Sequence, residues 1–183
     1  FLSETSDEKI EFTANNIEYE FSSGKKGLYD FTFKEESGRL VGIMGGSGSG
    51  KSTLLNVLNG NYPPSSGEIK INGIGLYENP KLLEGVIGFV PQDDLLIEEL
   101  TVYQNLYYNA KLCLGNLDEE QINETVVNAL NKFDLFYVKD LKVGSPINKF
   151  ISGGQRKRLN IALELIIEPY LLFADEPTSG LSS

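Results

Sequence analysis

Apolar and polar positions alternate along the first part of the chain, a pattern that predicts β-strands. Turn-forming residues separate the strand candidates at 10–14, 17–21, 28–34 and 67–73. The first three are expected to form an antiparallel sheet. This sheet would lead into 39–44, a short apolar run that predicts a buried strand.

From residue 101 onward the apolar period changes to about 3.6 residues, which predicts helices. One apolar stripe follows Thr101 as N-cap, a second follows Asp118, and a third opens at 152–155 and ends before a proline. Two continuous apolar runs, 85–90 and 170–174, predict buried strands, the second buried on both faces. The pattern therefore indicates an α/β fold.

Composition narrows the class of protein. With 183 residues, of which 40% are apolar and 23% charged, the chain is expected to be one soluble domain with a core. The net charge of −10 argues against a nucleic-acid-binding surface, so the basic run 156–158 is interpreted as a solvated helix face. The single cysteine, Cys113, excludes an internal disulfide and is expected to be buried and inert. No signal peptide is visible, and no apolar run approaches the about 18 residues of a membrane span.

A glycine-rich stretch between the 39–44 segment and an apolar helix carries the clearest chemistry: Gly45-Gly46-Ser47-Gly48-Ser49-Gly50-Lys51-Ser52-Thr53. It fits the phosphate-loop pattern G-x-x-x-x-G-K-[ST]. Glycines let backbone N–H groups converge on one anion, and the following helix adds the positive end of its dipole. Lys51 would then neutralise the β- and γ-phosphates, and the Ser52 hydroxyl would bind Mg²⁺. A flexible linker has no reason to lie in this context.

In this order the motifs resemble the nucleotide-binding domain of ATP-binding-cassette (ABC) proteins over nearly the whole chain. The phosphate loop alone indicates only a P-loop NTPase. The run Ile151-Ser152-Gly153-Gly154-Gln155 is similar to the family signature, and Gln92 and 179–182 stand where its Q-loop and D-loop would be. The runs 153–158 and 175–181 are most similar to the G (White-type) subfamily of transporters.

The resemblance implies a RecA-like P-loop NTPase core with an N-terminal antiparallel β subdomain and an inserted α-helical subdomain. Within one domain, 1–183, it assigns 1–92 to the β subdomain and phosphate-loop core, 93–151 to the helical subdomain, and 152–183 to the signature helix and Walker B strand. The sequence begins without methionine and stops at Ser183, before the family's switch histidine and closing strands. We therefore expect a C-terminally truncated piece of a longer protein, which alone would bind ATP poorly or hydrolyse it slowly.

The resemblance also suggests roles for individual residues. Asp175 is expected to hold Mg²⁺ through water, together with Ser52 and Gln92. Glu176 can accept a hydrogen bond from the attacking water, and Lys51 and Gln92 complete the catalytic set. Gln92 could sense metal and water without adding charge, although an ordinary loop amide is the alternative interpretation.

Nucleotide contacts are implied at two further places. Phe21 stands where the family has an aromatic that stacks on adenine; Tyr19 is the second choice, and a core aromatic is the alternative. Ser152, Gly153, Gly154 and Gln155 open a helix with a hydroxyl and N–H groups available to a second anion. In the family this signature closes on ATP held by the other subunit, which implies a head-to-tail dimer around two ATP molecules. Ser182 replaces the family's D-loop aspartate, so the contact there is expected to be weaker or different.

The expected function is therefore an ATP- and Mg²⁺-dependent hydrolase module that drives a membrane transporter. Its transmembrane partner would dock near 93–101, at the cytoplasmic face of the cell membrane, and lie in the same longer chain or in a separate subunit. A soluble ABC ATPase of translation or DNA repair is the second interpretation, but no coiled coil, tandem domain or basic arm is visible. A regulatory domain that binds ATP without turnover is the third, and Glu176 argues against it. A small P-loop kinase would leave 152–155 unexplained.

Overall fold

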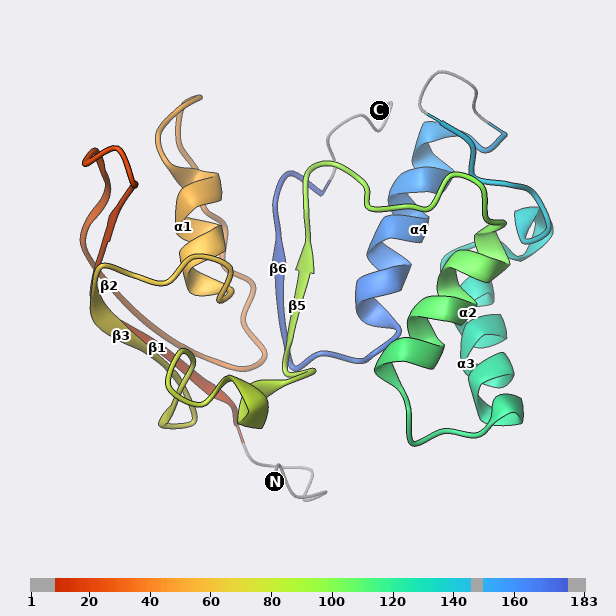
Figure 1. The fold of residues 1–183 in the computed structure, drawn as a ribbon, viewed down its shortest axis with the longest axis horizontal. Coiled ribbons are helices and arrows are strands. Elements are labelled where there is room, and N and C mark those ends of the chain that lie inside the picture. Colours follow the sequence, from red (N-terminus) through yellow and green to blue (C-terminus); the bar gives the residue numbers. More distant parts are fainter. Residues whose placement is uncertain (1–8, 146–149, 178–183) are drawn as a thin grey trace. The chain divides into compact units, whose positions relative to one another are not determined.

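The computed structural model describes residues 9–145 and 150–177, and the predicted D-loop at 179–182 lies outside them. The chain divides into two compact units, Phe1–Ile87 and Gly88–Ser183 (Figure 1). Each unit is described by itself. The finer boundaries expected at 92 and 151 stay predictions.

The first unit is built on a four-stranded antiparallel sheet in the order β2-β1-β3-β4 (Figure 1). Its strands are β1 (Glu11–Glu20), β2 (Lys26–Glu36), β3 (Ser66–Ile71) and β4 (Ile74–Gly75). The predicted strands 10–14 and 17–21 are one strand, because the register shifts between Ala14 and Ile17 instead of the pairing ending there. This bulge moves the apolar alternation from even to odd positions, and both residues are fully buried.

The first unit also contains the helices α1 and η1. The helix α1 (Lys51–Leu58) starts inside the predicted phosphate loop and buries Leu55, Val57 and Leu58. The 3₁₀ helix η1 (Pro80–Leu83) comes after β4. The Tyr77 hydroxyl donates to the Val57 carbonyl at 2.8 Å, which links α1 to the segment after β4.

The predicted buried strand at 39–44 is wrong for this structure. β2 ends at Glu36, the chain turns, and residues 39–46 belong to neither of the sheets in the described residues. Leu40 and Met44 are fully or almost fully exposed. An apolar run indicates a preference for burial, but a strand also needs neighbours that supply hydrogen bonds and cover its faces. The unit's sheet ends at β2 and supplies neither to this segment.

The second unit combines a two-stranded sheet, β5 (Ile87–Val90) and β6 (Leu171–Ala174), with helices. The helices are α2 (Val102–Cys113), α3 (Glu119–Lys132), the 3₁₀ helix η2 (Phe136–Val138) and α4 (Gly153–Leu165). α2 packs against both α3 and α4 (Figure 1). The expected N-caps are confirmed, because Thr101, Asp118 and Ser152 each form a capping box with a glutamine three residues later.

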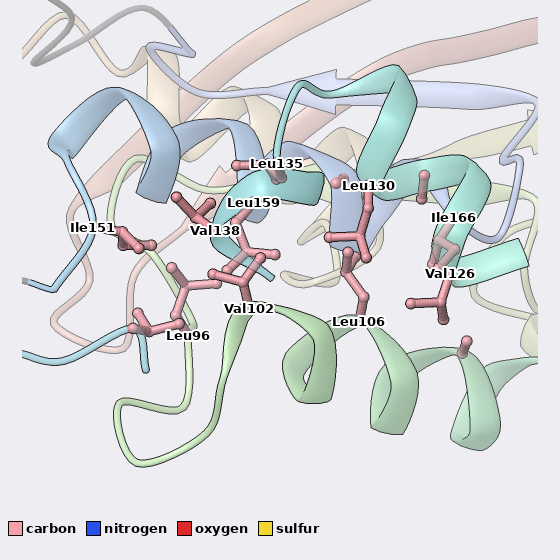
Figure 2. Packing of buried hydrophobic residues seen from close by; sticks show 14 of the residues in the cluster. Leu96, Val102, Leu106, Val126, Leu130, Leu135, Val138, Ile151, Leu159 and Ile166 are labelled. Carbon is pink, nitrogen blue, oxygen red and sulfur yellow. The ribbon is translucent and has the colours of Figure 1, made fainter. Parts of the chain in front are cut away.

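The hydrophobic core of the second unit lies between these helices (Figure 2). Its fully buried members on the helices recur at helical spacing, as the apolar stripes predict: Val102, Leu106, Ala110, Val126, Leu130, Leu159 and Ala162. Leu135 and Val143, from the segments between the helices, are fully buried in the same cluster. Tyr103 and Tyr107 pack against this cluster.

Two burial predictions for the second unit are wrong. β6 pairs with β5 alone among the described residues, so its faces are incompletely covered, and Leu172 is 41% exposed. Cys113 is exposed because α2 ends at this residue. Its thiol group is nevertheless partly desolvated, and this desolvation, with the nearby Glu164 carboxylate, raises the pKa of the Cys113 thiol. The thiol therefore stays protonated at neutral pH, and it donates to Asn109 Oδ1 at 3.2 Å.

Candidate functional site

The glycine loop of the first unit has the geometry of an anion cradle. Gly50 is the N-cap of α1 with φ 93°, a left-handed conformation that favours glycine, and no side chain caps the helix. The N–H groups of the first helical turn are therefore not used by a side-chain cap and can bind an anion. Gly45 approaches Ser49 so closely that an added Cβ would lie 2.6 Å from the serine Oγ. The loop is thus folded tightly, and its backbone conformation favours glycine at Gly50.

Lys51 lies across this loop. Its Nζ donates to the carbonyl oxygens of Gly45 and Gly46, at 3.0 Å in each case. Ser52, next along, is exposed on the first turn of α1, and residues 45–49 are exposed as well. The loop therefore presents an ammonium and a hydroxyl on an accessible surface, as the phosphate-site prediction requires.

The aromatic residues predicted near adenine lie at the end of β1. Phe21 closes a turn, because its N–H donates to the Lys25 carbonyl at 2.9 Å. Its ring meets Tyr19 edge to face at 5.1 Å, and Tyr19 stacks on Tyr62 at 5.7 Å. Both predicted rings are partly buried and already have aromatic neighbours. Stacking of Phe21 or Tyr19 on a base stays a prediction.

In the second unit, the ends of β5 and β6 bring three predicted site residues together. The Asp175 N–H donates to the Val90 carbonyl at 2.9 Å, which joins the two strand ends. Gln92 Nε2 then donates to Glu176 Oε2 at 3.4 Å. Asp175 is 8% exposed, whereas Gln92 and Glu176 are exposed. A buried aspartate and a glutamate open to water therefore stand next to each other.

Glu176 also has an unusual backbone. Its φ is 47°, in the left-handed region that a non-glycine residue adopts at an energetic cost. Such conformations cluster at functional sites, where the surrounding structure holds them.

The signature segment opens α4 as predicted. The Ser152 Oγ accepts from the Gln155 N–H at 3.2 Å, and Gln155 Oε1 accepts from the Ser152 N–H at 2.6 Å. Gln155 Nε2 also donates to the Tyr137 hydroxyl at 3.1 Å. Ser152 and Gly153 are exposed, so this helix start is accessible. The Gln155 side chain itself is occupied within the unit.

The interpretation of 156–158 as a solvated face is wrong. Arg156 is 5% exposed and Lys157 is 8% exposed. Both side chains reach the loop after β5. Arg156 Nη2 donates to Asp94 Oδ1 at 2.9 Å, and Lys157 Nζ donates to the Gln92 carbonyl at 3.1 Å. Charge alone predicted solvent exposure, but both side chains are buried against hydrogen-bond partners that are distant in the sequence.

Local sequence held a signal for this missed site. Arg156, Asn160 and Glu164 recur every four residues on α4, which places polar side chains on one side of the helix. Asn160 is 2% exposed, and its Oδ1 accepts from the Leu95 N–H at 3.3 Å. A polar stripe beside an apolar one is therefore the pattern that could have indicated a buried network.

The predicted Mg²⁺ ligands are divided between the units. Ser52 belongs to the first, whereas Gln92 and Asp175 belong to the second. No cluster of three or more His, Cys, Asp or Glu side chains suited to a metal ion occurs in residues 9–145 and 150–177. Within the same ranges, no helix has the length and apolar character needed to cross a membrane.

A glycine loop that leads into a lysine-bearing helix, within a mixed α/β fold, defines the chain as a P-loop NTPase. A family model described as ABC transporter matches residues 28–179. The chain belongs to the ABC transporter family.

Known proteins agree with this assignment. The chain is 42% identical over 155 residues to ABC transporter G family member 28 of Arabidopsis thaliana, covering 83% of the chain and 14% of that protein. It is 38% identical to ABC transporter G family member 1 of Petunia hybrida, covering 96% of the chain and 27% of that protein. These relatives confirm the similarity to the G family, and the chain spans about a quarter or less of their length.

Among solved structures, the fold is similar to cbiO1 from Clostridium perfringens, described as part of the ABC transporter complex cbiONQ. The TM-score is 0.79 at 33% identity, with 93% of this chain and 67% of that chain covered. The predicted P-loop NTPase fold is confirmed by this likeness.

Proposed function

We propose that this chain is the ATP-binding and ATP-hydrolysing motor domain of an ABC transporter. The observation that carries the proposal is the phosphate loop. Gly50 leaves the start of α1 without a side-chain cap, and Lys51 folds over the exposed loop. N–H groups, a helix dipole and an ammonium then act on the same anion, which suits a triphosphate.

The residues assigned to Mg²⁺ carry suitable ligand groups. Ser52 offers a hydroxyl, Asp175 a carboxylate and Gln92 an amide oxygen, and Mg²⁺ prefers such oxygen ligands with several waters retained. When bound, the metal would neutralise charge on the β- and γ-phosphates. Asp175 supports this role because its backbone is joined to β5 and the residue is mostly buried, so its place at the strand end is fixed.

The hydrolytic step is assigned to Glu176, the second of the two acidic residues after β6. Glu176 would accept a hydrogen bond from a water molecule and take its proton as the water oxygen bonds to the γ-phosphorus. The bond from that phosphorus to the β,γ-bridging oxygen breaks, and ADP and phosphate are released. Gln92 would hold the Glu176 carboxylate by the amide contact at 3.4 Å. Exposure of Glu176 supports this role, since the group must meet water.

We further propose a head-to-tail dimer around two ATP molecules. Ser152 and Gly153 are exposed at the start of α4, so a phosphate of a facing copy could reach this second anion site. Closure on ATP would be transmitted through 93–101 to a transmembrane partner, in the same longer chain or in a separate subunit, at the cytoplasmic face of the membrane. The description of cbiO1 as part of a transporter complex supports this assembly.

The test compares ATP hydrolysis by the full-length protein and two variants. Lys51→Ala is expected to weaken ATP binding, because it removes the only ammonium of the loop. Glu176→Gln is expected to bind ATP but to lose about 10²–10⁴-fold in kcat, because the amide cannot take the proton. Light scattering of Glu176→Gln with ATP should show a dimer, since the trapped nucleotide joins the two copies.

Other outcomes would contradict separate parts of the proposal. Tight ATP binding without turnover by the unaltered protein would favour a regulatory domain. A Glu176→Gln protein that stays monomeric with ATP would exclude the sandwich dimer. The 183 residues alone are expected to turn over ATP more slowly than the full-length protein, and equal rates would overturn that expectation.

A further inference from the structure

The segment that carries Gln92 is bound by side chains of α4 at both of its ends. The Phe89 N–H donates to Glu164 Oε2 at 3.0 Å. The Leu95 N–H donates to Asn160 Oδ1 at 3.3 Å. The two acceptors are four residues apart on α4 and lie on the same side of the helix. One face of the signature helix therefore faces 89–95.

Lys157 holds the middle of this segment. Its Nζ donates to the Pro91 carbonyl at 3.4 Å and to the Gln92 carbonyl at 3.1 Å. The residue is 8% exposed. In the described residues, the ion pairs found do not include Lys157. Removing an ammonium from water without a carboxylate partner is costly, so stability alone gives little reason for this lysine.

We propose that Lys157 is a positioning residue for Gln92. It fixes the backbone carbonyls on either side of the Gln92 α-carbon, and the side chain extends from that anchored point to Glu176. A displacement of about 1 Å at a reacting group can reduce a rate about 100-fold. The inference rests on the proposed ATP hydrolysis, in which Gln92 orients Glu176.

Arg156 has a different task on the same helix. Its guanidinium binds both oxygens of Asp94, and its Nη1 donates to the Val143 and Gly144 carbonyls. These contacts brace the segment beyond Gln92 against residues 143–144. None of them involves Gln92 or Glu176, so loss of Arg156 is expected to act first on folding.

The test measures kcat and ATP affinity in the full-length protein. Lys157→Met keeps the side-chain length without donors, and it is expected to lower kcat about ten-fold or more while ATP affinity changes less than about two-fold. Lys157→Arg keeps a cation with N–H donors and is expected to recover part of kcat. The double variant Lys157→Met with Gln92→Ala should be no slower than Gln92→Ala alone, because Lys157 acts through Gln92.

Lys132→Met is the matched control, since Lys132 is an exposed lysine of a neighbouring helix. It should keep the kcat of the unaltered protein. If Lys157→Met retains kcat, or if its loss adds fully to that of Gln92→Ala, the positioning role is wrong while ATP hydrolysis stands. Should Lys157→Met fail to fold, the same cycle with Lys157→Arg decides. If the unaltered protein and Lys132→Met both lack turnover, the proposed function itself fails.

Discussion

Nε and Nη2 of Arg156 lie 3.0 and 2.9 Å from the two carboxylate oxygens of Asp94, so the ion pair is bidentate. The arginine side chain is 6% exposed and the aspartate side chain 27% exposed. Geometry of this kind gives both orientation and energy, because two parallel hydrogen bonds must be kept together. The pair joins the signature helix to the loop after β5.

Removal of Asp94 should destabilise the second unit. Asp94→Ala leaves the Arg156 guanidinium buried with only carbonyl partners, and we expect the free energy of unfolding to fall by about 2 kcal/mol. This lies below the about 3–5 kcal/mol of a fully buried pair, because Asp94 is partly exposed. Equilibrium denaturation checks the value. Asp93→Ala removes an exposed neighbouring charge and should change stability little, so equal losses in the two variants would contradict the role of the pair.

Ser152 should combine a structural role with a functional one. It caps α4 as Thr101 caps α2, each with a glutamine at the third helical position. Ser152→Ala and Thr101→Ala should each lower the free energy of unfolding by about 1 kcal/mol. Only Ser152→Ala should also lower ATP-driven dimer formation, because in the proposed dimer its hydroxyl would contact a second nucleotide. The measurements are thermal unfolding and light scattering with ATP.

Thr101→Ala is the control for Ser152→Ala, because both residues cap a helix. Equal loss of dimer formation in both variants would mean that helix stability, and not the signature hydroxyl, controls assembly. Ser152→Thr keeps a hydroxyl that can cap, so it should retain most of both properties.

Local chemistry explains what could be predicted from the sequence. The caps at Thr101, Asp118 and Ser152 depend on residues within one helical turn. The spacing of these residues in the sequence was therefore sufficient to predict the helix starts. The phosphate loop is equally local, since Gly50 and Lys51 act on backbone a few residues away.

Partners distant in sequence explain the rest. Lys157 is buried because the Gln92 carbonyl, 65 residues away, accepts its hydrogen bond. The 39–44 segment was expected to be buried, but its strand depends on neighbours that its own residues do not specify. The contact from Gln92 to Glu176 spans 84 residues, and the family resemblance indicated only that both residues belong to the catalytic set.

The strained backbone of Glu176 yields a test of stability against activity. At φ 47° a side chain costs about 1–2 kcal/mol, which glycine avoids at the expense of unfolded-state entropy. Glu176→Gly should therefore unfold about 1 kcal/mol less readily than Glu176→Ala, while both lose ATP hydrolysis. Denaturation of the two variants measures the difference. An alanine variant as stable as the glycine variant would show that the turn relaxes when the carboxylate is absent.

Tyr77 should make stability depend on pH in the alkaline range. Burial raises the pKa of Tyr77 from 10.0 to about 12, and its hydroxyl donates to the carbonyls of Val57 and Tyr62. Because the folded state holds this proton more tightly, its contribution is complete below pH 10 and is lost as pH rises toward about 12. The free energy of unfolding of the unaltered protein should fall more steeply across this range than that of Tyr77→Phe. Parallel curves would contradict the assignment.

Phe21 should contribute to binding of the adenine base but not to binding of the phosphates. Its ring is partly buried at the end of β1 and meets Tyr19 edge to face. Phe21→Ala is expected to weaken ATP binding about ten-fold or more, because stacking contributes about 1–3 kcal/mol per base. Inorganic triphosphate lacks a base and should bind Phe21→Ala and the unaltered protein equally, since Lys51 is untouched. Phe21→Tyr should keep ATP affinity. Equal losses for ATP and triphosphate would instead make Phe21 a core residue that supports the fold.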